Sequence, residues 1–169
     1  MSLLGKKLLE LTSKSSKRKR QIVMPNYADA SHMGIIYTYG DEKKEESINE
    51  LIKLIDDEKQ VDVLCYINSK EIVTTKHPSF QIDQLNNWGK FNSKEVEYFQ
   101  NANFDFLIHF DFEEDEIVQS LLRQTKAKCR VGFHSENTIQ YYELMISMNK
   151  SAGSANFAKQ IMKYIKAIK

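Results

Sequence analysis

Residues 33–67, MGIIYTYGDEKKEESINELIKLIDDEKQVDVLCYI, contain two strand-like runs on either side of a helical pattern. The runs 33–39 and 61–67 have strand length and are rich in β-branched and aromatic residues. Between them, residues 42–58 place apolar side chains at helical spacing behind Asp41, which is well placed to cap a helix. A strand, a helix and a strand of this length form a right-handed crossover between parallel strands.

The same alternation returns toward the end of the chain. Strands are predicted at 104–110, 129–133 and 141–147. A helix between the first two is predicted to begin at Asp111 with Glu114 as its capping pair, and an amphipathic helix with Ser154 as its N-cap closes the chain. Strands that alternate with helices predict an α/β fold, a three-layer sandwich around a mainly parallel, Rossmann-like sheet.

The middle of the chain is less regular. Residues 71–75 predict a short strand, and Pro78 excludes the residues after it from the interior of a sheet. Asn92 with Glu95 three residues later predicts a capping box that opens a short helix.

Charge divides the chain into two parts. Residues 1–20 hold seven of the 24 Lys and Arg but one of the 23 Asp and Glu, so their net charge is +6 and that of the other residues is −5. We therefore expect a basic N-terminal arm over 1–24, which includes Lys17, Arg18, Lys19 and Arg20, and a single α/β domain over 25–169. The arm suits a solvated tail, or a helix that packs its leucines on the domain or a protein partner. An anionic membrane surface is the next alternative, and nucleic acid suits the arm less well because it has no aromatic residue to stack on bases.

The composition is that of a globular protein, with 41% hydrophobic and 28% charged residues among 169. No apolar run is long enough to span a membrane, and the N-terminus has no secretory pattern. Cys65 and Cys129 both fall in apolar runs, which indicates buried, inert thiols. We expect a protein of the reducing cytoplasm.

Polar residues follow the predicted strands at the edge where ligands bind to parallel sheets. They are Gly40, Asp41, Asn68, Ser69, Asp111, His134, Ser135 and Glu136. Asp41, Asp111 and His134 could perform acid–base chemistry there or hold a divalent cation, with Gly40, Asn68, Ser69 and Ser135 as binding residues. Both aspartates are equally suited to cap helices, which requires no chemistry.

Several specific motifs are missing from the chain. It has no glycine-rich dinucleotide fingerprint, P-loop, nucleophile elbow or spaced metal-ligand motif. The run Glu113–Glu116 indicates the solvated first turn of a helix rather than a metal site, and His109 indicates a hydrogen-bonded histidine of the core or sheet edge. No metal or cofactor is expected.

Five stretches resemble a family of short, uncharacterised proteins from Bacteroidetes. They are HMGIIYTYGDEKKEESINELI, QLNNWGKFNSKEVEYF, FDFLIHFDFEEDEIVQSLL, AKCRVGF and YYELMI, and the likeness covers most of residues 20–168. That resemblance implies a bacterial protein but no catalytic residues, because the family has no established activity.

A second resemblance is to the N-terminal half of heptosyltransferase-like glycosyltransferases. Gly40-Asp41 after the first strand and Arg130-Val131-Gly132-Phe133 in a later one carry it. The donor sugar nucleotide of that family is bound mainly by a C-terminal domain, so the resemblance implies a degenerate relative kept for binding. The sequence thus favours a binding or interaction module without catalytic activity. The alternative is a small enzyme of unknown type, of which a degenerate glycosyltransferase-like domain is one form, with its site at the carboxyl ends of the strands.

Overall fold

One parallel sheet organises the computed structural model, which describes residues 24–71, 73–84 and 91–168. Six strands of the described residues lie in the order β3-β2-β1-β4-β5-β6, and every neighbouring pair is parallel. The strands are β1 (His32–Thr38), β2 (Gln60–Ile67), β3 (Ser79–Gln81), β4 (Phe106–His109), β5 (Cys129–Phe133) and β6 (Leu144–Ile146). The predicted α/β fold with a Rossmann-like sheet is confirmed.

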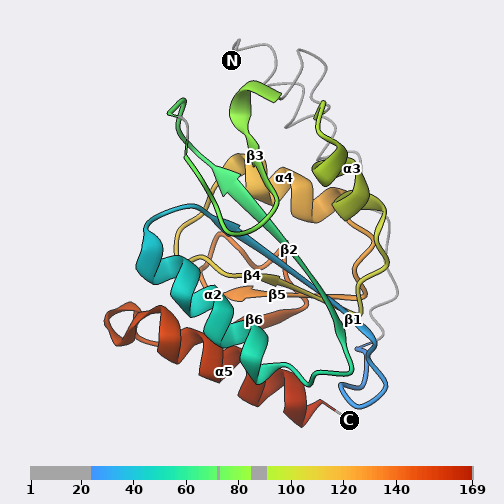
Figure 1. Cartoon of the computed structure of the whole chain (residues 1–169). Coiled ribbons are helices and arrows are strands. Elements are labelled where there is room, and N and C mark those ends of the chain that lie inside the picture. The colour runs from blue at the N-terminus through green and yellow to red at the C-terminus, as the bar shows by residue number, and fades with distance from the viewer. Residues whose placement is uncertain (1–23, 72, 85–90, 169) are drawn as a thin grey trace.

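Helices cover both faces of the sheet (Figure 1). α2 (Glu42–Leu54) and α5 (Gly153–Ala167) lie on one face, where Ile48 and Ile161 join a core with Ile35 of β1. α3 (Lys94–Asn101) and α4 (Glu116–Gln124) lie on the other, where Phe99 and Leu121 form a second core. Short 3₁₀ turns occur at Ile82–Gln84 and Lys150–Ala152. Successive side chains of each strand point to opposite faces of the sheet, so the strands contribute to both cores. This is expected of a sheet that is buried on both faces.

The strand–helix–strand crossover of residues 33–67 forms as the sequence predicts. β1 and β2 pair in parallel from His32 opposite Gln60 to Thr38 opposite Tyr66. Asp41 is the N-cap of α2, and its side chain accepts a hydrogen bond from the Lys44 N–H at 2.9 Å. The helix ends at Leu54, four residues before the predicted end.

Three predicted helix starts are wrong by one to four residues. α3 is capped by Ser93 instead of Asn92, since the Ser93 hydroxyl accepts from Val96 N–H and this register turns Val96 and Phe99 inward. α4 is capped by Asp115 instead of Asp111, because the Asp111 side chain is engaged elsewhere.

The third wrong start is that of α5, whose cap position is Ala152, without a side-chain hydrogen bond, instead of Ser154. The acidic run before α4 also differs from the prediction. Only Glu116 lies inside the helix, so Glu113 and Glu114 precede it.

The predicted strand at 71–75 is wrong for the residues of it that the structure describes. Residue 71 and residues 73–75 form no strand, and the sheet gains its edge strand at Ser79–Gln81, directly after Pro78. Proline is tolerated beside an edge strand because no ladder hydrogen bond is needed from it there. The predicted basic arm, with Lys17 to Arg20, lies outside the described residues except for Met24.

Both cysteines are buried and free, as predicted. Burial raises the pKa of the Cys65 thiol to about 11 and that of Cys129 to about 12. Across the described ranges, every helix is too short or too polar to cross a bilayer.

Candidate functional site

The switch point of this sheet lies between β1 and β4, where the strand order reverses. In open α/β sheets, ligands bind in the crevice outside the carboxyl ends of the strands at this point. The chain places Thr38 at the end of β1, the start of α2 after it, and Asp111 directly beyond β4. A catalytic site of the predicted kind would lie here.

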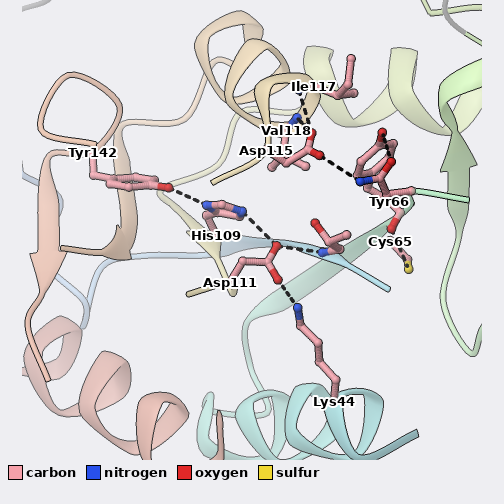
Figure 2. A network of polar contacts seen from close by, with 11 residues as sticks. Lys44, Cys65, Tyr66, His109, Asp111, Asp115, Ile117, Val118 and Tyr142 are labelled. Atoms are coloured by element: carbon pink, nitrogen blue, oxygen red, sulfur yellow. Dashed lines mark hydrogen bonds and ion pairs between the residues drawn. The ribbon is translucent and has the colours of Figure 1, made fainter. Parts of the chain in front are cut away.

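Asp111 is buried and bridges the two central strands. Its Oδ2 accepts from the Thr38 N–H at 2.8 Å and from His109 Nε2 at 3.0 Å, while its Oδ1 is paired with the Lys44 ammonium of α2. Figure 2 shows these contacts converging on the carboxylate. Burial alone would raise the pKa of Asp111, but the hydrogen bond from His109 and the charges of His109 and Lys44 outweigh it and hold that pKa below its usual value.

His109 and Tyr142 extend the network away from the switch point (Figure 2). The Tyr142 hydroxyl lies 2.5 Å from His109 Nδ1, and both side chains are buried. An ionised Asp111 can only accept, so the Nε2–H of His109 donates to it, while Nδ1 shares a hydrogen bond with the Tyr142 hydroxyl. Burial, helped by the negative charge of Asp111, raises the pKa of Tyr142, so the phenol keeps its proton. We call these four residues, Lys44, His109, Asp111 and Tyr142, the switch-point network.

Gly132 explains how Tyr142 reaches His109. A Cβ at this position of β5 would overlap the ring of Tyr142. A glycine inside a strand often marks such a close approach. Arg130 of the same motif pairs with Glu143, with Nη2 and Oε1 2.7 Å apart. The glycine and arginine that carry the glycosyltransferase resemblance therefore have local packing partners here.

Asp41 occupies the helix start at which a Rossmann-like domain would hold a phosphate. A phosphate binds there through free N–H groups and the positive end of the helix dipole. In this chain the Asp41 carboxylate accepts a hydrogen bond from the Lys44 N–H, and it adds a negative charge at the start of α2. Asp41 and Asp111 therefore engage the same residue, Lys44, one through its main chain and one through its ammonium.

His134 does not join the switch-point network. Its side chain is exposed, and its N–H donates to the Ile146 carbonyl at 3.0 Å in a continuation of the pairing between β5 and β6. Of the three predicted acid–base residues, Asp41 is an exposed helix cap, Asp111 is a buried bridge between strands, and His134 is an exposed side chain. Gly40 is exposed, next to the cap.

The predicted binding residues at this edge contact other protein groups. Asn68 Nδ2 donates to Asp115 Oδ2 at 3.5 Å, and the Ser69 carbonyl accepts from Gln81 Nε2 at 3.4 Å. The Ser135 hydroxyl donates to Glu114 Oε1 at 2.5 Å. The bonds of Asn68 and Ser135 tie the loops after β2 and β5 to the segment around the start of α4, and that of Ser69 ties the loop after β2 to β3.

Sequence reasoning did not select Lys44 or Tyr142. Lys44 is one of two adjacent lysines at the start of a polar helix, and nothing local distinguishes it from Lys43. Gly132 in the middle of a strand was a usable signal for Tyr142, since it indicates that something bulky packs closely. Within the described residues, no group of three or more His, Cys, Asp or Glu is arranged to hold a metal ion.

The sheet order and its crossovers place the chain among α/β proteins with a Rossmann-like fold. Within that class it belongs to the family of unknown function DUF6913, whose family model matches residues 2–168. No curated protein matches the chain. No solved structure matches it either.

Proposed function

We propose that this domain is a binding module without catalytic activity, in which the switch-point network serves the fold. The observation that carries the proposal is the buried Asp111 bridge between β1, β4 and α2. A carboxylate with three protein donors and little exposed surface has no free oxygen to offer a substrate.

The cap at α2 supports the same proposal. Phosphate-containing ligands need the helix N-terminus that Asp41 occupies, and its negative charge opposes theirs. The hydrogen bonds of Asn68 and Ser135 to the α4 segment extend the pattern of polar groups that bond within the chain.

The alternative is a small enzyme of unknown type, of which a degenerate glycosyltransferase-like domain is one form, with a site at the carboxyl ends of the strands. The exposed His134 side chain is the feature that favours it, because a catalytic acid or base must reach substrate. Origin in the bacterial cytoplasm stays a prediction for either function.

A melting experiment with small ligands tests the proposal. A ligand at one hundred times its Kd stabilises a protein by about 2.7 kcal/mol, which for a chain of this size raises Tm by roughly 5–10 °C. We expect adenine nucleotides, dinucleotides and sugar nucleotides to leave Tm unchanged. A saturable rise with one of them that His134→Ala abolishes would favour the enzyme instead. Ser147→Ala is the control, an exposed residue just after β6.

A further inference from the structure

β2 has an open edge along its first half. It pairs with β1 from Gln60 to Tyr66, but with β3 only from Cys65 to Ile67. Figure 1 shows β2 extending well beyond the short β3. Opposite residues 60–64, the described part of the chain supplies no further strand.

The pairing with β3 stops for a local reason. Cys65 N–H donates to the Pro78 carbonyl at 2.9 Å. One step back, the same parallel register would set the Pro78 nitrogen against the Val63 carbonyl, and proline has no N–H to donate. The chain before Pro78 turns away toward α2, where Lys76 N–H donates to Glu45 Oε1 at 3.1 Å.

Main-chain groups are therefore directed outward from this edge. Gln60 N–H donates toward β1, to the Ser31 carbonyl, whereas Cys65 N–H donates toward β3. Because successive residues of a strand direct their main-chain groups to opposite sides, Val61 and Val63 face the open edge like Cys65. Each offers one donor and one acceptor there.

A groove runs along this edge, with α3 as its opposite wall. It has a volume of about 460 Å³, and its lining includes Val61, Asp62, Val63, His77, Pro78 and Tyr98. Tyr98 is 55% exposed, and its hydroxyl donates to Asp62 Oδ2 at 2.9 Å. An exposed aromatic side chain over a partly apolar groove is typical of an interface anchor.

His77, which also lines the groove, has an unsatisfied polar atom. Its Nε2 is buried and has no hydrogen-bond partner among the described residues. Buried polar atoms are almost always bonded, so this nitrogen lacks a partner that the described residues do not supply. Burial lowers the pKa of His77, so the ring is neutral at physiological pH and suits a peptide amide better than an anion.

We propose that the groove between the open edge of β2 and α3, which we call the β2–α3 groove, binds an extended peptide segment by strand addition, with a basic side chain placed at Asp62. The segment continues the line of β3 and pairs its main chain with Val61 and Val63. This inference rests on the proposed function and names the class of partner.

A second copy of the chain fits the edge less well than a basic peptide. Two β2 edges that pair about a two-fold axis centred on Val61–Val63 set Asp62 opposite Asp62, and like charges directly opposite each other destabilise a strand pair. Lys or Arg at that place would instead pair with the carboxylate, which already accepts from His32 and Tyr98.

The first test is amide hydrogen exchange in the free full-length chain. Amides directed at β1, such as that of Leu64, are expected to exchange slowly, and those of Val61 and Val63 rapidly. Slow exchange of Val61 and Val63 in the free monomer would mean that the chain already covers this edge. Concentration-dependent slowing would mean that a second copy does. Either result overturns the proposal.

The second test is a titration with a capped peptide of alternating valine and lysine, followed by amide NMR. We expect shifts confined to residues 60–64, His77 and α3, and exchange of Val61 and Val63 slowed roughly tenfold or more at saturation. The same peptide with alternate amides N-methylated cannot pair and should not bind. A peptide of alternating valine and glutamate should bind more weakly because of Asp62.

Variants distinguish strand pairing from nonspecific apolar binding. Val63→Pro removes one outward N–H without breaking the pairing with β1, and should weaken binding roughly fivefold or more relative to Val63→Ala, which keeps the donor. Tyr98→Ala should weaken binding, whereas Tyr164→Ala, which removes an exposed tyrosine of α5, should not.

Three results overturn the inference. They are no shift at millimolar peptide, equal binding of the N-methylated peptide, and equal binding by the Tyr98→Ala and Tyr164→Ala proteins. If these occur while nucleotides also fail to raise Tm, the proposal of peptide binding in the β2–α3 groove is wrong, but the proposal of a binding module stands. If a nucleotide raises Tm in the manner described above, the proposed function itself fails.

Discussion

Asp111→Asn should destabilise the domain strongly, because the substitution removes the negative charge on which three donors converge. The asparagine oxygen can still accept from Thr38 N–H and His109 Nε2, which share one carboxylate oxygen, but its amide group would then face the Lys44 ammonium. The charge of Lys44 then loses its partner and lies against another donor.

The magnitude follows from the exposure of the two partners. Removing one partner of a fully buried ion pair costs about 3–5 kcal/mol. The Asp111 side chain is 5% exposed, but that of Lys44 is 22% exposed and can partly turn to water. We therefore expect the lower end, a loss of about 3 kcal/mol, which lowers Tm by roughly 6–12 °C.

Urea unfolding followed by circular dichroism measures this loss, with the m-value as a check that only stability has changed. The matched control is Asp115→Asn at the cap of α4, where asparagine keeps the oxygen that accepts from Ile117 and Val118. Asparagine and aspartate cap helices about equally well, so the control should lose no more than about 0.5 kcal/mol.

The pH dependence of the loss tests its electrostatic cause. The folded state holds the pKa of Asp111 below its usual value, so its contribution is present above about pH 4 and is lost as the pH falls through the lowered pKa. The gap between wild type and Asp111→Asn should therefore narrow below about pH 4. A loss below about 1 kcal/mol at neutral pH, or a gap that does not change with pH, would refute the reasoning.

Three further predictions concern packing, thiols and the arm. Gly132→Ala should cost about 1–3 kcal/mol because its methyl group overlaps Tyr142, while Gly40→Ala, whose nearest neighbour is Lys44 Cδ at 3.4 Å, should be nearly neutral by urea unfolding; equal losses would contradict the packing of Tyr142. Cys65 and Cys129 should not react with a thiol reagent in the native protein and should react fully in urea, because both are buried with raised pKa values; rapid native reaction would contradict their burial. Replacing the four basic residues 17–20 by glutamine should weaken sedimentation with phosphatidylserine vesicles by about 1 kcal/mol per charge at low salt; unchanged binding would exclude an electrostatic role of the arm.

Local sequence patterns account for most of the fold. The β-branched runs and the helical spacing of residues 33–67 predict the first crossover, which forms with the register of a parallel pair. The sequence identifies Asp41 as a cap because this residue directly precedes the helical pattern of residues 42–58. The start of α4 was not, since Asp111 and Asp115 both precede the helix and a tertiary contact with Thr38 decides between them.

The two candidate sites depend on contacts that no local pattern contains. Lys44 and Asp111 are 67 positions apart, and their pairing follows from the strand order. The groove depends on where β3 pairs with β2, and the sequence favoured residues 71–75 over the edge strand at Ser79–Gln81. His77 lies in a loop without a motif, and its unbonded Nε2 becomes visible only when the chain around it is placed.

A pair of amide NMR titrations of the same full-length protein tests the central claim most directly. One uses the alternating valine–lysine peptide and the other ADP. The account predicts that the peptide shifts residues 60–64 and α3, and that ADP leaves residues 38–44 and Asp111 unchanged. Saturable ADP shifts at residues 38–44 and Asp111, with no peptide shifts along β2, would contradict it.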